Sequence, residues 1–159
     1  MVKVMFVCHG NICRSPMAEF IFKDMLKKQG LEDKFLVKSS ATSTEEIYNG
    51  RGNPVYPPAR EILLKNGIDC GEKRAVQLTK SDYEKYDFFI AMDNNNIRNI
   101  GRIFGSDNQN KVYKLMSFTG SNSDVADPWY TGDFRTTYND ILFGCSYFLE
   151  YLVNNDFLN

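Results

Sequence analysis

The residues with the clearest capacity for chemistry lie in one short segment, VCHGNICRS, which runs from Val7 to Ser15. Cys8 and Arg14 stand in it with five residues between them. An ionised thiol is a strong nucleophile, and a planar guanidinium can bind two oxygens of a phosphate group at once. The spacing therefore predicts a thiolate and a phosphoryl group that face each other in one loop.

The residues between these two suit a loop that binds an anion. Gly10 and Asn11 both tolerate the left-handed backbone of a tight loop. Ser15 followed by Pro16 predicts the N-cap and the first residue of a helix. A strand, a tight loop and a helix N-terminus together present backbone N–H groups and a positive dipole end, which favour a thiolate or a phosphate. The hydroxyl of Ser15 can donate a hydrogen bond to the sulfur and ease its later departure.

A leaving alcohol needs a proton, and the segment VADPWY offers the best donor, Asp127. Pro128 restricts Asp127 to an extended backbone, which helps to aim its carboxyl group. Trp129 and Tyr130 provide flat walls that can hold an aromatic ring. Asp127 can therefore act first as an acid and then as a base toward water. His9, the only histidine, is expected at the pocket rim without a part in proton transfer.

The other cysteines allow two interpretations. Cys13 is either a small packing residue or a second thiol that traps oxidised Cys8 as a reversible disulfide. Cys70 and Cys145 are expected to be structural. The C-x4-C spacing has no second ligand pair, so no metal site is predicted.

Composition narrows the class of protein. The 159 residues suit one domain that spans 1–159, and a formal net charge of −1 gives no general attraction to nucleic acid or membrane. No apolar run reaches the length of a membrane span, and the first residues, MVKVMFV, lack a signal-peptide layout. We therefore expect a cytoplasmic protein with reduced thiols. Neither G-x-x-x-x-G-K-[ST] nor G-x-G-x-x-G occurs, so the common nucleotide-binding loops are excluded.

Strands and helices alternate along the chain. Buried strands are predicted at Val2–Val7, Leu36–Ala41, Asp87–Met92 and Lys111–Met116. Helices are predicted from Ser15 to Gly30, Pro57 to Gly67, Asp93 to Arg102 and Phe134 to Asn154, and a long polar loop from Ser117 to Asp133. This order predicts an α/β fold, a single-domain three-layer sandwich whose parallel sheet carries helices on both faces. Ligands bind such sheets beyond the carboxyl ends of the strands, which is where the opening segment and Asp93 lie.

Three segments resemble the low-molecular-weight protein tyrosine phosphatase family. FVCHGNICRSPMAE (Phe6–Glu19) resembles the phosphate loop of that family, and DPWY (Asp127–Tyr130) resembles its acid loop. MDNNN (Met92–Asn96) and the order of the elements agree as well, so the resemblance spans nearly the whole chain. It implies a four-stranded parallel sheet. It also implies hydrolysis through a cysteinyl-phosphate, without a metal or another cofactor.

The resemblance also implies roles for single residues. By position, Cys8 is the nucleophile, Arg14 binds phosphate and stabilises the transition state, and Asp127 is the acid. Asn11 holds the loop in its strained shape, and Ser40 matches a serine that supports this asparagine. The other positions of the phosphate-binding loop are His9, Gly10, Ile12, Cys13 and Ser15, the last of which assists the thiolate.

Some positions depart from the family pattern. His9 stands where an apolar residue is common and makes the rim more polar. Lys73 stands where a buried histidine is common, and a lysine can donate a hydrogen bond but cannot accept one. The segment Ser43–Pro54 is longer than the usual variable loop. The expected walls of the pocket are Ile47, Tyr48, Trp129 and Tyr130.

Three functions compete. The leading hypothesis is a phosphatase for phosphotyrosine in proteins and for small aryl phosphates, which releases inorganic phosphate and acts as a monomer or with weak self-association. A deep, narrow cradle favours phosphotyrosine over the shorter phosphoserine. An arsenate reductase would need a close pair of further cysteines, and Cys70 and Cys145 are far apart in the sequence. A non-catalytic phosphopeptide-binding module would be expected to lack Cys8 or Asp127.

Overall fold

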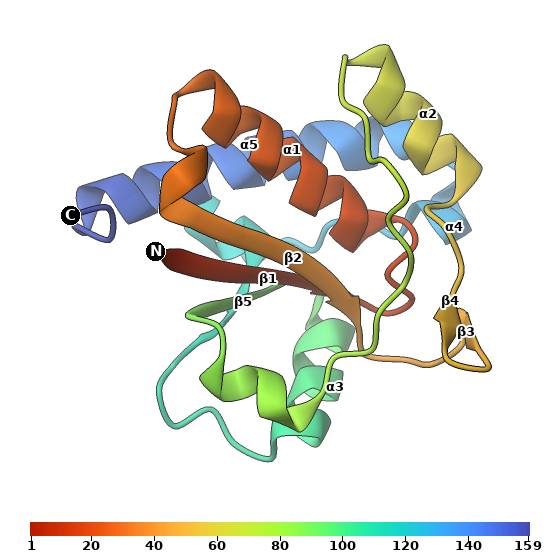
Figure 1. Cartoon of the computed structure of the whole chain (residues 1–159), viewed down its shortest axis with the longest axis horizontal. Helices are drawn as coiled ribbons and strands as arrows, with labels where there is room; N and C mark the ends of the chain where they lie inside the picture. Colours follow the sequence, from red (N-terminus) through yellow and green to blue (C-terminus); the bar gives the residue numbers. More distant parts are fainter.

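The computed structural model describes residues 1–159 and contains one four-stranded parallel sheet (Figure 1). The strands are β1 (Val2–Cys8), β2 (Phe35–Ala41), β5 (Phe88–Ala91) and β6 (Val112–Lys114), in the spatial order β2-β1-β5-β6. β1 pairs with β2 along its whole length and with β5 on its other side. The carboxyl end of β1 therefore has a neighbouring strand on each side, at the end of the sheet where all four strands terminate. The predicted α/β class and parallel sheet are confirmed.

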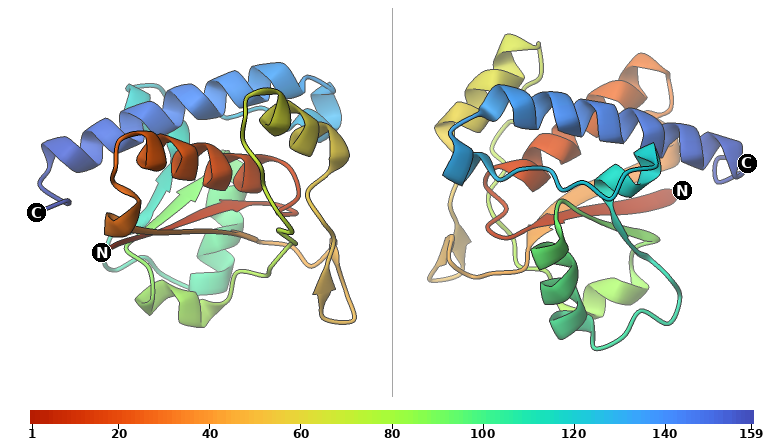
Figure 2. Two further views of the ribbon diagram at one scale, coloured as in Figure 1. Left: turned by 45° about the horizontal axis from the view of Figure 1, so that its top comes forward. Right: turned by 180° about the vertical axis from the view of Figure 1, so that it is seen from behind.

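Helices lie on both sides of the sheet (Figures 1 and 2). α1 (Arg14–Lys28), α2 (Pro57–Lys65) and α5 (Phe134–Asn154) lie on one side, and α3 (Asn94–Phe104) and the 3-10 helix η2 (Lys80–Glu84) lie on the other. Alternate side chains of β1 enter two different cores. Val4 and Phe6 belong to the core under α1 and α5, whereas Met5 and Val7 belong to the core under α3. This arrangement is the predicted three-layer sandwich.

Shorter elements connect these layers. β3 (Ile47–Tyr48) and β4 (Arg51–Gly52) form an antiparallel hairpin outside the main sheet. Two 3-10 helices, η1 (Glu32–Lys34) and η3 (Leu115–Thr119), and the four-residue helix α4 (Pro128–Thr131) complete the chain. The prediction of one loop from Ser117 to Asp133 is wrong at both ends, because this stretch begins inside η3 and contains α4. Pro128 opens α4, and Gly132 ends it in the left-handed conformation.

Most predicted helix boundaries agree with the structure, and one cap does not. α5 has the predicted bounds, and Asp93 caps α3 by accepting a hydrogen bond from the Asn96 backbone at 2.7 Å. Ser15 is not the N-cap of α1, because the helix already begins at Arg14 and Cys13 holds the cap position. The hydroxyl of Ser15 points instead to the sulfur of Cys8. None of the helices combines the length and the apolar character that are needed to cross a bilayer.

Candidate active site

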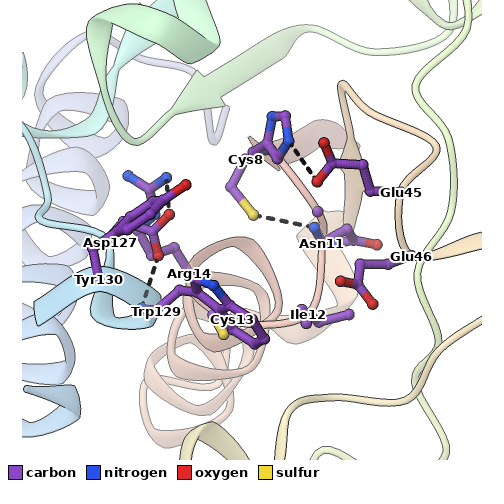
Figure 3. A pocket seen from close by; sticks show the side chains of 12 residues that line it. Cys8, Asn11, Ile12, Cys13, Arg14, Glu45, Glu46, Asp127, Trp129 and Tyr130 are labelled. Carbon is purple, nitrogen blue, oxygen red and sulfur yellow. Dashed lines mark hydrogen bonds and ion pairs between the residues drawn. The ribbon is translucent and has the colours of Figure 1, made fainter. Parts of the chain in front are cut away.

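A pocket opens at the carboxyl end of β1, between the loop that follows this strand, the segment before β3, and α4 (Figure 3). The loop from Cys8 to Arg14 forms most of it. Its lining residues are Cys8, His9, Gly10, Asn11, Ile12, Cys13, Arg14, Glu45, Glu46, Asp127, Trp129 and Tyr130. The fold therefore brings together the two segments that the sequence selected, although more than a hundred residues separate them.

The sulfur of Cys8 is surrounded by hydrogen-bond donors. The backbone N–H groups of Asn11 and Ser15 donate to it at 3.3 and 3.4 Å, and the Ser15 hydroxyl lies 3.0 Å away. The same hydroxyl accepts a hydrogen bond from Asn11 Nδ2 at 2.7 Å, so its own proton is available for the sulfur. Because backbone dipoles and the N-terminus of α1 converge there, negative charge on the sulfur or on a bound phosphate is stabilised.

Asn11 holds the loop in shape through its side chain. It is the one non-glycine residue of the loop with a positive φ, 60°, and it is 1% exposed. Its Nδ2 donates to Ser15 and to Ser39 Oγ at 3.0 Å, and its Oδ1 accepts from the Val76 backbone at 3.0 Å. These bonds tie the loop to α1, to β2 and to the segment after α2. A strained backbone is thus maintained by a fully bonded side chain.

The serine that supports Asn11 is Ser39, which corrects the prediction of Ser40. The Ser40 hydroxyl is buried and has no hydrogen-bond partner. Neighbouring side chains of a strand point to opposite faces, so a shift of one residue reverses the assignment. Ser39 also donates to Glu19 Oε1 at 2.6 Å, a buried carboxylate that the sequence analysis missed. Its spacing in α1, one turn after Ser15, is a signal that could have found it.

Lys73 supports this network from behind. Its Nζ donates to the Ser39 backbone carbonyl at 2.9 Å and lies 3.8 Å from Glu19 Oε1. It makes no hydrogen bond to Asn11, whose side chain bonds Ser15, Ser39 and Val76, so its inability to accept a hydrogen bond removes nothing from the loop asparagine. Burial lowers the pKa of Lys73, and the negative charge of Glu19 opposes that effect. Lys23 pairs with the other oxygen of Glu19 at 2.6 Å.

Arg14 is held in position by three acceptors. Its Nη1 donates to Asp93 Oδ2 at 2.7 Å and to the Val125 carbonyl at 2.8 Å, and its Nη2 lies 3.5 Å from Asp127 Oδ2. Its side chain is only 4% exposed. Asp93 therefore has two roles, because one carboxylate oxygen caps α3 and the other orients the guanidinium. The sequence analysis recognised the cap but missed the contact with Arg14.

Asp127 faces Arg14 from the opposite wall. Its Oδ1 accepts a hydrogen bond from the Trp129 backbone at 3.0 Å, which leaves Oδ2 directed at the pocket. The Trp129 ring packs on Tyr56 with a centroid distance of 5.0 Å. Tyr56 in turn donates its backbone N–H to the Ile12 carbonyl at 2.9 Å. The acid loop and the phosphate loop are thereby connected, and Trp129 and Tyr130 line the mouth, as predicted.

The wall opposite these aromatic rings is acidic, which corrects the prediction of Ile47 and Tyr48. Neither of them lines the pocket: Ile47 packs beside Ile12 and Cys13, and Tyr48 is 66% exposed on the hairpin. Glu45 and Glu46, the two residues before the hairpin, line the pocket instead. Both side chains are held by polar partners: Glu45 Oε2 lies 3.0 Å from His9 Nε2, and Glu46 Oε2 accepts a hydrogen bond from Asn53 Nδ2 at 2.7 Å.

Comparison with known proteins decides the family. Residues 3–156 match the family described as low molecular weight phosphotyrosine protein phosphatase. The chain belongs to this family. YfkJ of Bacillus subtilis, a curated low molecular weight protein-tyrosine-phosphatase, is 38% identical over 151 residues that cover 94% of each chain. PtpA of Staphylococcus aureus, which carries the same description, is 35% identical over 156 residues, or 98% of this chain and 96% of PtpA.

Solved structures agree with this assignment. The crystal structure of YfkJ superposes on this phosphatase with a TM-score of 0.91 and 37% identity, over 98% of this chain and 96% of the other. YwlE, described as an arginine phosphatase, superposes with a TM-score of 0.84 at 28% identity, over 99% and 100% of the two chains. The family resemblance is confirmed, and this phosphatase is an enzyme of the protein-tyrosine-phosphatase class.

The cysteines of this phosphatase are all free thiols. Burial raises the pKa of Cys13 far above its ordinary value, and the charge of the neighbouring Cys8 acts in the same direction. Cys13 is therefore a thiol at neutral pH, and its capture of oxidised Cys8 stays a prediction. Cys70 and Cys145 are both buried free thiols of the main core and lie far apart in the sequence. No group of three or more His, Cys, Asp or Glu side chains is arranged to hold a metal ion.

Asn11 permits a prediction that separates backbone strain from hydrogen bonding. Asn11→Ala should lower the free energy of unfolding by about 3 kcal/mol, because it leaves buried partners unbonded and places a Cβ in the left-handed region without local compensation. Asn11→Gly loses the same side-chain bonds but tolerates the conformation, so it should be about 1 kcal/mol more stable than Asn11→Ala. Urea unfolding of the three proteins measures both differences. Equal stability of the two variants would show that the positive φ carries no strain.

Proposed function

We propose that this phosphatase hydrolyses phosphotyrosine in proteins, and small aryl phosphates, through a cysteinyl-phosphate formed on Cys8. The observation that carries the proposal is the convergence of three groups in one pocket. They are a sulfur that accepts hydrogen bonds from two backbone N–H groups, the oriented guanidinium of Arg14, and the carboxyl group of Asp127. A thiolate nucleophile, an anion-binding fork and an acid are the groups that phosphoryl transfer to sulfur requires.

In the first step, the Cys8 sulfur forms a bond to phosphorus while the bond from phosphorus to the phenol oxygen breaks. Asp127 gives its proton to that oxygen, and Arg14 binds the non-bridging oxygens. In the second step, the Asp127 carboxylate takes a proton from water, the water oxygen attacks phosphorus, and the sulfur–phosphorus bond breaks. The Ser15 hydroxyl donates a hydrogen bond to the departing thiolate and keeps its proton, as its 3.0 Å separation from the sulfur permits. Inorganic phosphate and the thiolate remain.

The depth of the pocket supports phosphotyrosine as the substrate. Cys8 is 4% exposed at the floor, whereas Trp129 and Tyr130 are 55% and 85% exposed at the mouth. A phosphate at the floor therefore places an attached phenyl ring between the walls, where aromatic side chains pack well against it. The shorter side chain of phosphoserine would draw the peptide backbone into the mouth.

Other expectations complete the proposal. Nucleophile, cation and acid are all side chains, so the two steps use no metal and no other cofactor. Four free thiols suit a reducing compartment, which supports a cytoplasmic location. The substrates are phosphoproteins, and we propose that the enzyme acts as a monomer or with weak self-association, without nucleic acid or membrane as a partner.

Asp127→Asn tests the acid. With excess chelator present, it should lower kcat on a phosphotyrosine peptide roughly 100-fold, because the amide cannot protonate the phenolate. The loss should be smaller on an aryl phosphate whose phenol is more acidic and needs less help to leave. The same peptide with phosphoserine should react far more slowly with the wild-type enzyme. Equal rates on the two peptides would overturn the substrate class, and an unchanged kcat for Asp127→Asn would overturn the role of the acid.

A further inference from the structure

A second hollow, which we name the arginine hollow, lies beside the hairpin and is lined mainly by charged side chains. Its lining residues are Arg51, Pro54, Arg60, Gly71, Glu72 and Arg74. They come from β4, from the segment after it, from α2 and from the turn before residue 75. Three cations and one carboxylate thus meet in a protein whose formal net charge is −1. The positive charge is therefore a local feature and does not follow from composition.

The guanidinium groups are positioned but not neutralised. Arg60 Nη2 donates to the Gly71 carbonyl at 2.8 Å, and Arg74 Nη1 donates to the Gly52 carbonyl at 2.9 Å. Arg51 makes no side-chain hydrogen bond, and none of the three arginines forms an ion pair with a carboxylate, Glu72 included. A guanidinium carries five N–H donors, so each of these groups keeps donors for a further acceptor. Backbone carbonyls orient two of the guanidinium groups, and because these acceptors are neutral, the positive charge remains.

The arginine hollow is connected to the active site through the hairpin. Glu46, which lines the pocket, comes directly before β3, and Ile47 pairs with Gly52, the residue whose carbonyl holds Arg74. Asn53 donates its backbone N–H to the Glu46 carbonyl at 2.8 Å. The hairpin thus joins the two sites, because Glu46 before β3 lines the pocket, whereas Arg51 of β4 and Arg74 line the hollow. A peptide bound at the pocket can therefore extend along the hairpin toward the hollow, advancing about 3.3 Å per residue.

We propose that the arginine hollow is a second anion site, which binds acidic side chains of the protein substrate a few residues away from the phosphotyrosine. This inference rests on the proposed function. The chemistry is the match between guanidinium forks and carboxylates. The rim of the pocket carries Glu45 and Glu46 and repels acidic residues directly beside the phosphotyrosine, so the favoured acidic residues lie farther along the peptide. The result is a preference set by position as well as by charge.

The test measures kcat/KM on matched peptides. Each carries one phosphotyrosine, and a block of three Asp residues stands at increasing distance before or after it, with Asn in the control peptides. One placement of the Asp block should raise kcat/KM of the wild-type enzyme above its Asn control through KM. Arg51→Gln should reduce this gain about two- to fivefold, because a single partly exposed ion pair contributes little. The double variant, Arg51→Gln with Arg74→Gln, should remove the gain entirely. Glu72→Gln should increase the gain, because it removes the one carboxylate of the hollow, which repels the Asp block.

Controls separate this proposal from the proposed function. Arg102→Gln removes an exposed arginine of α3, on the other side of the sheet, and should leave the peptide preference unchanged. Para-nitrophenyl phosphate has no acidic side chains that the hollow could bind, so all four variants should hydrolyse it at the wild-type rate. If the enzyme is active but no placement of Asp improves kcat/KM over Asn, the second anion site is refuted while the proposed function stands. A wild-type enzyme that is inactive on every substrate would instead refute the proposed function itself.

Discussion

Cys8→Ser is expected to lower the hydrolysis of para-nitrophenyl phosphate by roughly four to six orders of magnitude, the scale on which loss of a nucleophile acts. The hydroxyl has nearly the size of the thiol and can keep the backbone donors of Asn11 and Ser15. It does not ionise near neutral pH, however, and a serine oxygen is a much poorer leaving group from phosphorus than sulfur. Both chemical steps are therefore impaired, whereas the anion site itself remains.

This prediction is checked by kinetics together with binding. Cys8→Ser should still bind inorganic phosphate, and its thermal unfolding midpoint should stay close to that of the wild-type protein. Cys70→Ala is the matched control, because Cys70 is a buried thiol outside the pocket and its loss should leave kcat unchanged. If Cys8→Ser retained a substantial fraction of the activity, an attack by water without a covalent intermediate would replace the proposed mechanism.

Arg14→Lys is expected to lower kcat roughly 1,000-fold, since the oriented donors that stabilise developing negative charge are lost. In the wild-type structure the guanidinium uses Nη1 for Asp93 and for the Val125 carbonyl, which leaves its other donors for the phosphate oxygens. A lysine ammonium is a point charge on a flexible stem. It can satisfy Asp93 or the phosphate, but it cannot hold both in one fixed plane.

The comparison with Asp93→Asn makes this prediction sharper. Asp93→Asn keeps the guanidinium and weakens only its orientation, so its loss of kcat should be smaller than that of Arg14→Lys. Because the amide oxygen can still accept from Asn96, the cap of α3 should survive, and the stability of the two variants can be compared by urea unfolding. An Arg14→Lys enzyme with nearly normal kcat would mean that charge alone, without the planar fork, is sufficient at this position.

The chemistry of the site was readable from the sequence because it is local. Within nine residues, a strand end, a loop with Asn11 in the left-handed conformation and a helix N-terminus follow one another, and these neighbours along the chain are also neighbours in space. Hydrophobic runs separated by helical patterns were enough to predict the parallel sheet and the longest helix, since burial of such patterns has few solutions. Asp127 was found for the same reason, because the adjacent Pro128 restricts its backbone to an extended conformation.

What surrounds that chemistry was decided by the tertiary structure. Ser39 rather than Ser40 bonds Asn11 because the pairing of β2 with β1 sets which face each residue takes. Glu45 and Glu46 line the pocket, in place of Ile47 and Tyr48, because the hairpin turns the latter pair away. The sequence by itself determined the nucleophile, the anion loop and the acid, whose roles depend on residue type and adjacent backbone. Only the fold decided the supporting and selecting groups, because strand register and loop packing are set by contacts between distant segments, which carry no mark in the local sequence.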